Sequence, residues 1–149
     1  MKRIIVVSIL ALIAIFGMGN TMSAASKKDE AKAMVRKAIQ FYKANGKEKT
    51  LEAITAGKFK KDELYVFAYS KEGVMLAHPV NKSLIGKNLI DVPDDAGKYF
   101  RKEIVQKAKA SGIGWVDYKY KNPKTERVED KTTYFKKVDG IIFCCGVYK

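Results

Sequence analysis

Two runs of alternating side chains and a third, largely apolar run fill the last third of the chain and predict an antiparallel β-meander. The runs cover residues 114–121, 129–138 and 141–148. Successive side chains of a strand point to opposite faces of its sheet, so an alternating run is typical of a strand. Asn122-Pro123 separates the first two runs. Asp139-Gly140 separates the last two and is the strongest hairpin signal in the chain.

The segments before the meander switch between helical and extended patterns. Their apolar residues recur at three- and four-residue steps, as on one face of a helix, or form short runs rich in Tyr, Val and Phe. The predicted helices cover residues 27–45, 49–56 and 96–110, and a predicted hairpin joins 64–70 to 74–78. Asp94 or Asp95 is the predicted N-cap of the third helix. This order of elements predicts a single α+β domain without internal repeats.

The first 25 residues have the pattern of a secretory signal. Lys2-Arg3 precedes an uncharged apolar run from Ile4 to Phe16, and small residues follow up to a Ser23-Ala24-Ala25 site that a signal peptidase could cut. The alternative is a retained membrane anchor, but a spanning helix needs roughly 20 apolar residues. We predict cleavage, a mature domain of residues 26–149, and a periplasmic location.

The chain is strongly basic, with a formal net charge of +13, which becomes +11 when the two basic residues of the signal are removed. Such a charge favours acidic partners, whether nucleic acid, anionic lipid or a small anion. Export argues against nucleic acid, and the sequence has no arginine-rich block or aromatic RNA-binding signature. Lysines stand beside acids, as in 27–30 and 60–63, so most of the charge is predicted to form a solvated surface.

The residue types that carry out catalysis are scarce. His78 is the only histidine, and the sequence contains no nucleophile elbow or phosphate-binding glycine loop. Cys144 and Cys145 are adjacent in a predicted strand, so their side chains point to opposite faces and neither has a separate partner. We therefore interpret both cysteines as structural, and we predict no catalytic activity, no cofactor and no bound metal.

Aromatic and basic side chains of the meander are candidates for a small-molecule site. A lysine among tyrosines could hold a carboxylate by charge-assisted hydrogen bonds. The candidates are Tyr118, Tyr134 and Lys136, followed by Tyr120, Trp115 and His78. Trp115 has the opposite parity to Tyr118 and joins it only if a bulge turns the strand. The alternative is that Tyr118 and Tyr134 form a cross-strand packing pair and that Lys136 lies at the surface.

Several short motifs occur in an order that resembles a known family. They are GVMLAHP at 73–79, IGKNL at 85–89, DAGKYF at 95–100, GWVDY at 114–118, NP at 122–123, KTTYFK at 131–136 and GVY at 146–148. In this order and spacing the chain resembles a single Cache domain of bacterial extracytoplasmic sensors. No single motif is diagnostic, but the resemblance covers nearly all of the chain after the predicted signal.

The resemblance implies a PAS-like antiparallel sheet of about five strands with a long N-terminal helix packed on one face. It also implies a pocket for small extracellular molecules, often short carboxylates, on the other face. Members usually belong to chemoreceptors or sensor kinases, between two membrane helices, and this sequence shows no second apolar segment. The leading hypothesis is a stand-alone exported sensor that binds a small organic anion and acts through a membrane receptor or sensor kinase partner. The alternative is a non-catalytic structural or interaction module of the cell envelope with a vestigial pocket.

Overall fold

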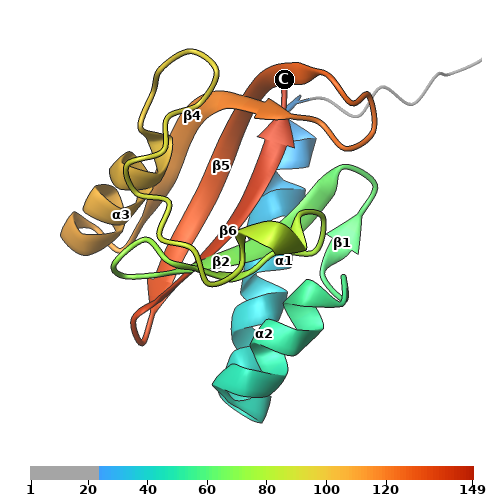
Figure 1. Ribbon diagram of the computed structural model, residues 1–149. Coiled ribbons are helices and arrows are strands. Elements are labelled where there is room, and N and C mark those ends of the chain that lie inside the picture. Colours follow the sequence, from blue (N-terminus) through green and yellow to red (C-terminus); the bar gives the residue numbers. More distant parts are fainter. Residues whose placement is uncertain (1–23) are drawn as a thin grey trace, which may run out of the picture.

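The computed structural model describes residues 24–149, which form an antiparallel sheet with helices on both faces (Figure 1). The helices are α1 (Ala24–Asn45), α2 (Lys47–Thr55) and α3 (Phe100–Ala110), and a short 3-10 helix, η1, covers Lys82–Leu84. The strands are β1 (Lys60–Lys61), β2 (Leu64–Ser70), β3 (Met75–Ala77), β4 (Ile113–Lys121), β5 (Val128–Val138) and β6 (Ile141–Tyr148). The predicted α+β fold with a long N-terminal helix packed on the sheet is confirmed. Residues 1–23, which contain most of the predicted signal, lie outside the described residues, and the predicted cleavage site falls at the first residues of α1.

The strands follow the order β1-β2-β6-β5-β4, and β3 pairs with β2. The last strand in the sequence, β6, lies between β2 and β5, and every one of its residues is buried. Asp139 and Gly140 join β5 to β6 with φ angles of 48° and 80°, as a tight hairpin of this type requires. The predicted hairpin is therefore confirmed.

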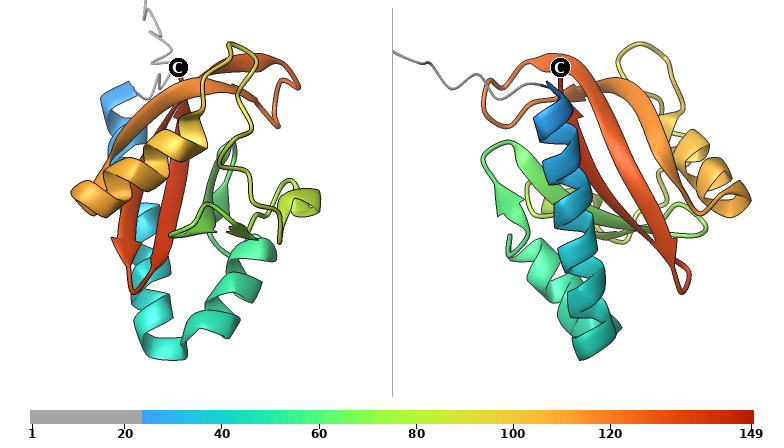
Figure 2. Two further views of the ribbon diagram at one scale, coloured as in Figure 1. Left: turned by 60° about the vertical axis from the view of Figure 1, so that its left-hand side comes forward. Right: turned by 180° about the vertical axis from the view of Figure 1, so that it is seen from behind.

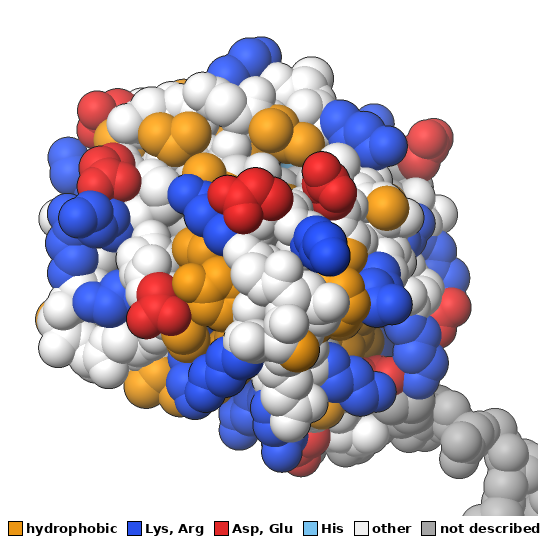
Figure 3. Space-filling model, turned by 90° about the horizontal axis from the view of Figure 1, so that it is seen from below, with side chains coloured by type: hydrophobic (Ala, Val, Ile, Leu, Met, Phe, Trp, Pro, Cys, Tyr) orange, Lys and Arg blue, Asp and Glu red, His pale blue; other side chains and the backbone are white. Residues whose placement is uncertain are grey.

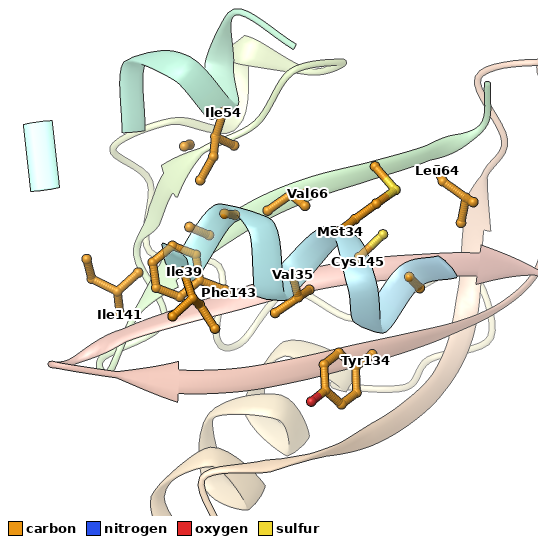
Figure 4. Close-up of a cluster of buried hydrophobic side chains, with 14 of the residues drawn as sticks. Met34, Val35, Ile39, Ile54, Leu64, Val66, Tyr134, Ile141, Phe143 and Cys145 are labelled. Atoms are coloured by element: carbon orange, nitrogen blue, oxygen red, sulfur yellow. The ribbon is translucent and has the colours of Figure 1, made fainter. Parts of the chain in front are cut away.

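One face of the sheet is covered by α1, which crosses it lengthwise (right-hand view of Figure 2), and by α2. The buried residues Ala31, Val35 and Ala38 recur at four- and three-residue steps and form the inner face of α1. They pack against side chains of β2, β5 and β6, including Val66 and Phe143 (Figure 4). We call this side of the sheet the α1 face.

The opposite side, which we call the α3 face, is covered by α3 and by the long connection between β3 and α3 (left-hand view of Figure 2). Phe100 and Ile104 of α3 are buried against Tyr69, Phe135 and Ile142 of the sheet. The central strands β2 and β6 therefore contribute alternate side chains to two separate cores, which is why β6 is apolar along its whole length.

The start of α3 differs from the prediction. The helix begins at Phe100 rather than at residue 96, because Gly97 has a φ of 80°, which an α-helix cannot accommodate. Neither Asp94 nor Asp95 caps it. The Asp94 carboxylate instead accepts hydrogen bonds from the backbone N–H groups of Ala96 and Lys98, and from that of Lys119 in β4. Asp94 thus fastens the long connection to the edge of the sheet.

Basic side chains do not form one block on the face of the molecule seen from below. Figure 3 shows lysine and arginine side chains spread over the face seen from below, with acidic side chains among them. This distribution agrees with the predicted solvated surface. None of the helices formed by residues 24–149 is long and apolar enough to cross a membrane.

Candidate functional site

The register between β4 and β5 divides the predicted site residues between the two faces of the sheet. Trp115 pairs with Tyr134, and Tyr118 pairs with Lys131. Paired residues point to the same face, so Trp115 and Tyr134 belong to the α1 face, whereas Tyr118 belongs to the α3 face. The expectation that one ligand contacts Tyr118, Tyr134 and Lys136 together does not hold, because the sheet separates Tyr118 from the other two.

Three of the predicted residues lie on the α1 face. The rings of Trp115 and Tyr134 are 5.3 Å apart between centroids, and the Lys28 ammonium lies 5.1 Å from the Trp115 ring. Lys136 is exposed. This group lies beside α1 and has no access to the α3 face.

Tyr118 is a packing residue of the α3 face. Its ring stacks on Phe100 with 3.8 Å between centroids, and its hydroxyl lies 2.8 Å from the Thr133 hydroxyl. Both interactions hold the ring between α3 and the sheet. The remaining two predicted residues, Tyr120 and His78, line a cavity on this face.

The centre of the α3 face is a buried lysine that the sequence analysis did not select. Lys131 is only 1% exposed. Its ammonium donates hydrogen bonds to the hydroxyls of Tyr65 (2.9 Å) and Tyr148 (3.2 Å). The same ammonium lies 4.3 Å from the centroid of the Tyr65 ring and 5.2 Å from that of the Tyr120 ring. An ammonium has three donors, so one remains after these two bonds.

Gly146 makes room for the Lys131 side chain. Lys131 leaves β5 and extends across β6 towards Tyr65 on β2, passing over Gly146. A Cβ at position 146 would lie 2.0 Å from Cε of Lys131 and 2.7 Å from the Thr133 hydroxyl. Any other residue at this position would therefore displace the lysine.

The positive charge of Lys131 has no negative partner among residues 24–149. No carboxylate forms an ion pair with it, and burial lowers its pKa from the usual 10.5 to about 7. Burying an ion without a counter-charge is unfavourable, so this ammonium is an electrostatic defect that an anion would relieve.

His78 presents a second donor on this face. It is 2% exposed, and its Nδ1 accepts the backbone N–H groups of Val80 (3.2 Å) and Asn81 (2.9 Å). With Nδ1 as acceptor, a neutral imidazole carries its proton on Nε2. Burial, followed by the nearby charges of Lys131 and Arg101, lowers the pKa of His78 to about 3, so the ring is neutral.

Arg101 is a second buried cation on the α3 face. It is 5% exposed, its Nη1 donates to the carbonyl of Val92 at 3.1 Å, and its Nε has no partner in the described part of the chain. Its guanidinium lies 4.2 Å from the Phe100 ring. The α3 face thus contains two buried positive charges and no ion pair that neutralises either of them.

A cavity of about 330 Å³ opens beside these groups. Tyr65, His78 and Tyr120 contribute to its wall, and Lys121 and Glu126 also line it. Lys131 lies behind this wall, where its ammonium contacts Tyr65 and Tyr120. Its size is at the lower end of small-molecule sites, which span about 300–1,000 Å³. Aromatic walls with a few convergent donors and a nearby positive charge suit a small anion.

The two cysteines contribute no donor to this cavity. Both are buried and free, Cys144 in the core of the α3 face and Cys145 in that of the α1 face, as their adjacency predicts. Burial raises the pKa of both thiols. Within residues 24–149, no cluster of three or more His, Cys, Asp or Glu side chains could hold a metal ion.

The missed residues left a signal in the sequence. Lys131 has the same parity as Thr133 and Phe135, so it shares their buried face, although a lysine is usually assigned to the surface. Gly146 interrupts a strand of otherwise large side chains and marks a close approach. The pairing of β5 with β6 is what places Gly146 under the side chain of Lys131, and this pairing cannot be seen in either segment alone.

The chain belongs to the single Cache family of sensor domains. The family described as Single Cache domain 2 matches residues 7–148. Its antiparallel sheet, with a long N-terminal helix packed on it, matches the PAS-like fold of Cache domains.

Particular relatives give the family context. The chain is 30% identical over 93 residues to the sensor histidine kinase MctS of Rhizobium johnstonii, and the match covers 62% of this chain but 20% of the kinase. The fold resembles a methyl-accepting chemotaxis protein from Vibrio parahaemolyticus, with a TM-score of 0.72 and 22% identity over 83% of this chain and 89% of that one. It also resembles a Cache chemosensory domain described for its carboxylic acid recognition, with a TM-score of 0.70 and 23% identity over 83% and 94% of the two chains.

Proposed function

We propose that this protein is an exported sensor module that binds a small organic anion in the cavity of the α3 face. The observation that carries this proposal is the Lys131 ammonium, which is buried without a carboxylate partner and held by two tyrosine hydroxyls. A ligand carboxylate would accept the free ammonium donor and the Nε2–H of His78, with Tyr65 supplying a further hydroxyl. Ion-assisted hydrogen bonds of this kind are about twice as strong as neutral ones.

The relatives support a short carboxylic acid as the ligand class. One structural neighbour is a Cache domain that recognises carboxylic acids, and the matched kinase and chemotaxis proteins are signalling receptors. We extend the ligand class to this chain because its cavity supplies positive charge and hydrogen-bond donors. Signal output would then require a membrane receptor or sensor kinase, and the signal-like first segment supports a periplasmic site of action.

A ligand screen tests the binding function directly. A ligand that binds only the folded protein raises its melting temperature by mass action. Purified protein should respond to one or more acids of two to four carbons, and not to urea or to the corresponding amides. If no acid shifts the melting temperature, the protein is a structural or interaction module instead.

Two matched lysine variants then test the position of the site. Lys131→Met removes the buried ammonium, and Lys136→Met removes an exposed one on the opposite face of the same strand. Removing the charged partner of a buried carboxylate costs about 2–5 kcal/mol, so Lys131→Met should weaken binding by well over tenfold in titration calorimetry. Lys136→Met should bind like the wild type. If Lys136→Met weakened binding and Lys131→Met did not, the site would lie on the α1 face.

A further inference from the structure

The α1 face has a second hollow that the proposed sensory function does not use. A groove of about 360 Å³ runs between α1 and β5. Val35 and Ile39 of α1 and Tyr134 of β5 form its apolar floor. Figure 4 shows Tyr134 at the edge of the buried cluster, with its hydroxyl pointing away from the other labelled side chains.

Positive side chains line both sides of this groove. Lys32, Arg36 and Lys43 follow one another along α1, and Lys136 approaches from β5. All four are exposed. Their only ion pair within residues 24–149 is the weak contact of 3.7 Å between Lys32 and Asp29, which is itself exposed. Asp139 lies near one end of α1, where it accepts a hydrogen bond from Tyr42 rather than pairing with a cation of the groove.

This arrangement is unfavourable for an isolated helix. Lys28, Lys32 and Arg36 stand at successive four-residue steps of α1, and like charges at this spacing repel each other. Elsewhere on the surface, lysines pair with acids, as Lys27 does with Glu63 and Lys107 with Glu103. The groove therefore differs from the general solvated surface because only one of its four cations, Lys32, has a counter-charge among the described residues.

We propose that the groove is the docking site for an acidic amphipathic segment of another protein. The cations on both sides would pair with its carboxylates, and the narrow apolar floor, whose side chains are at most 8% exposed, would contact its hydrophobic side. A second copy of this chain is a poor occupant, because a symmetric contact would bring the same cations face to face. A flat bilayer would not enter a hollow between a helix and a strand.

A peptide-binding experiment with matched variants tests this inference. The probe is a fluorescent amphipathic helical peptide with Glu on its polar face and Leu on the other, and its control carries Gln in place of Glu. The groove variant is Lys32→Gln/Arg36→Gln/Lys136→Gln. The control variant, Lys37→Gln/Lys82→Gln/Lys109→Gln, removes the same net charge from exposed lysines outside the groove. An unchanged melting temperature would show that each variant folds.

The proposal predicts that the Glu peptide binds the wild type and the control variant with affinities within about twofold, and the groove variant at least about tenfold more weakly. The Gln peptide should not bind. The proposal would be overturned by no binding to the wild type, by an equal loss in both variants, or by groove-dependent binding to equimolar phosphatidylglycerol and phosphatidylcholine vesicles without peptide binding. Self-association in sedimentation that is lost in the groove variant would also overturn it, because the groove would then bind a second copy of this chain. The cavity proposed for small acids lies on the α3 face, so none of these outcomes bears on the proposed binding of small acids.

Discussion

Replacing Lys131 by methionine should make the protein more stable while it removes anion binding. The ammonium of Lys131 is buried among aromatic rings and meets no carboxylate. Methionine keeps an unbranched apolar chain that can follow the same path over Gly146, so little cavity is created. The variant thereby separates the electrostatic effect of the lysine from its packing.

The expected magnitude follows from the pKa of Lys131. Burial lowers it from 10.5 to about 7. At about 1.4 kcal/mol per pKa unit, the charged ammonium destabilises the folded protein by roughly 5 kcal/mol. The variant also loses two hydrogen bonds, to Tyr65 and Tyr148, each contributing about 1 kcal/mol. We therefore expect the free energy of unfolding to rise by about 2–3 kcal/mol at pH 6.

The effect has a defined pH dependence. Because the pKa in the folded state lies below that in the unfolded state, the penalty is fully present below pH 7 and fades as the pH rises towards 10.5. The difference between the variant and the wild type should shrink by about 2–3 kcal/mol between pH 6 and pH 9. Urea unfolding followed by the fluorescence of Trp115, the only tryptophan, measures both values. A variant that is less stable at pH 6, or a difference that does not change with pH, would refute this account of the buried charge.

Four further predictions concern the anion site, the cysteines and the N-terminus. Anion affinity should fall about tenfold for each pH unit above 7, as Lys131 loses its proton, and calorimetry at pH 8 should detect proton uptake on binding. Gly146→Ala should weaken anion binding by at least about tenfold, because the new Cβ displaces Lys131, whereas wild-type affinity would show that the lysine path is not required. Changing Cys144 and Cys145 together to Ala should lower stability but leave affinity within a few-fold, and a loss that reducing agents reproduce in the wild type would reveal a redox role. Mass spectrometry of the exported protein should find Ser26 at or near its N-terminus, whereas an intact Met1 in the membrane fraction would indicate an anchor.

The local pattern of the chain predicted the helices and strands well because successive side chains of a strand point to opposite faces of the sheet. The hairpin at Asp139-Gly140, the opposite orientation of the two cysteines and the long first helix all depend on neighbouring residues only. The start of α3 was misplaced because Gly97 adopts a φ of 80°, and because Asp94, the predicted cap, bonds to Lys119 as well as to its own loop. A sequence window cannot contain that contact between distant segments.

The candidate site required information that only strand pairing supplies. Parity within β5 places Lys136 with Tyr134, as predicted, but the face that they share with Trp115 depends on the register with β4. Lys131 was passed over because lysines are seldom buried, and its burial depends on the glycine that β6 brings opposite. His78 and Tyr120, which the sequence analysis ranked as weaker candidates, line the cavity of the α3 face.

The uncompensated charge of Lys131 also determines what kind of ligand the cavity can distinguish. An anion that neutralises the ammonium restores its pKa towards the usual 10.5, so up to roughly 5 kcal/mol becomes available to binding. Part of this is offset by the desolvation of the carboxylate itself. An amide of the same shape must meet similar steric and hydrogen-bonding requirements, but it does not neutralise the charge of Lys131. The cavity should therefore separate an acid from its amide more sharply than it separates acids that differ by one methylene, for which an apolar wall provides only about 1–3 kcal/mol.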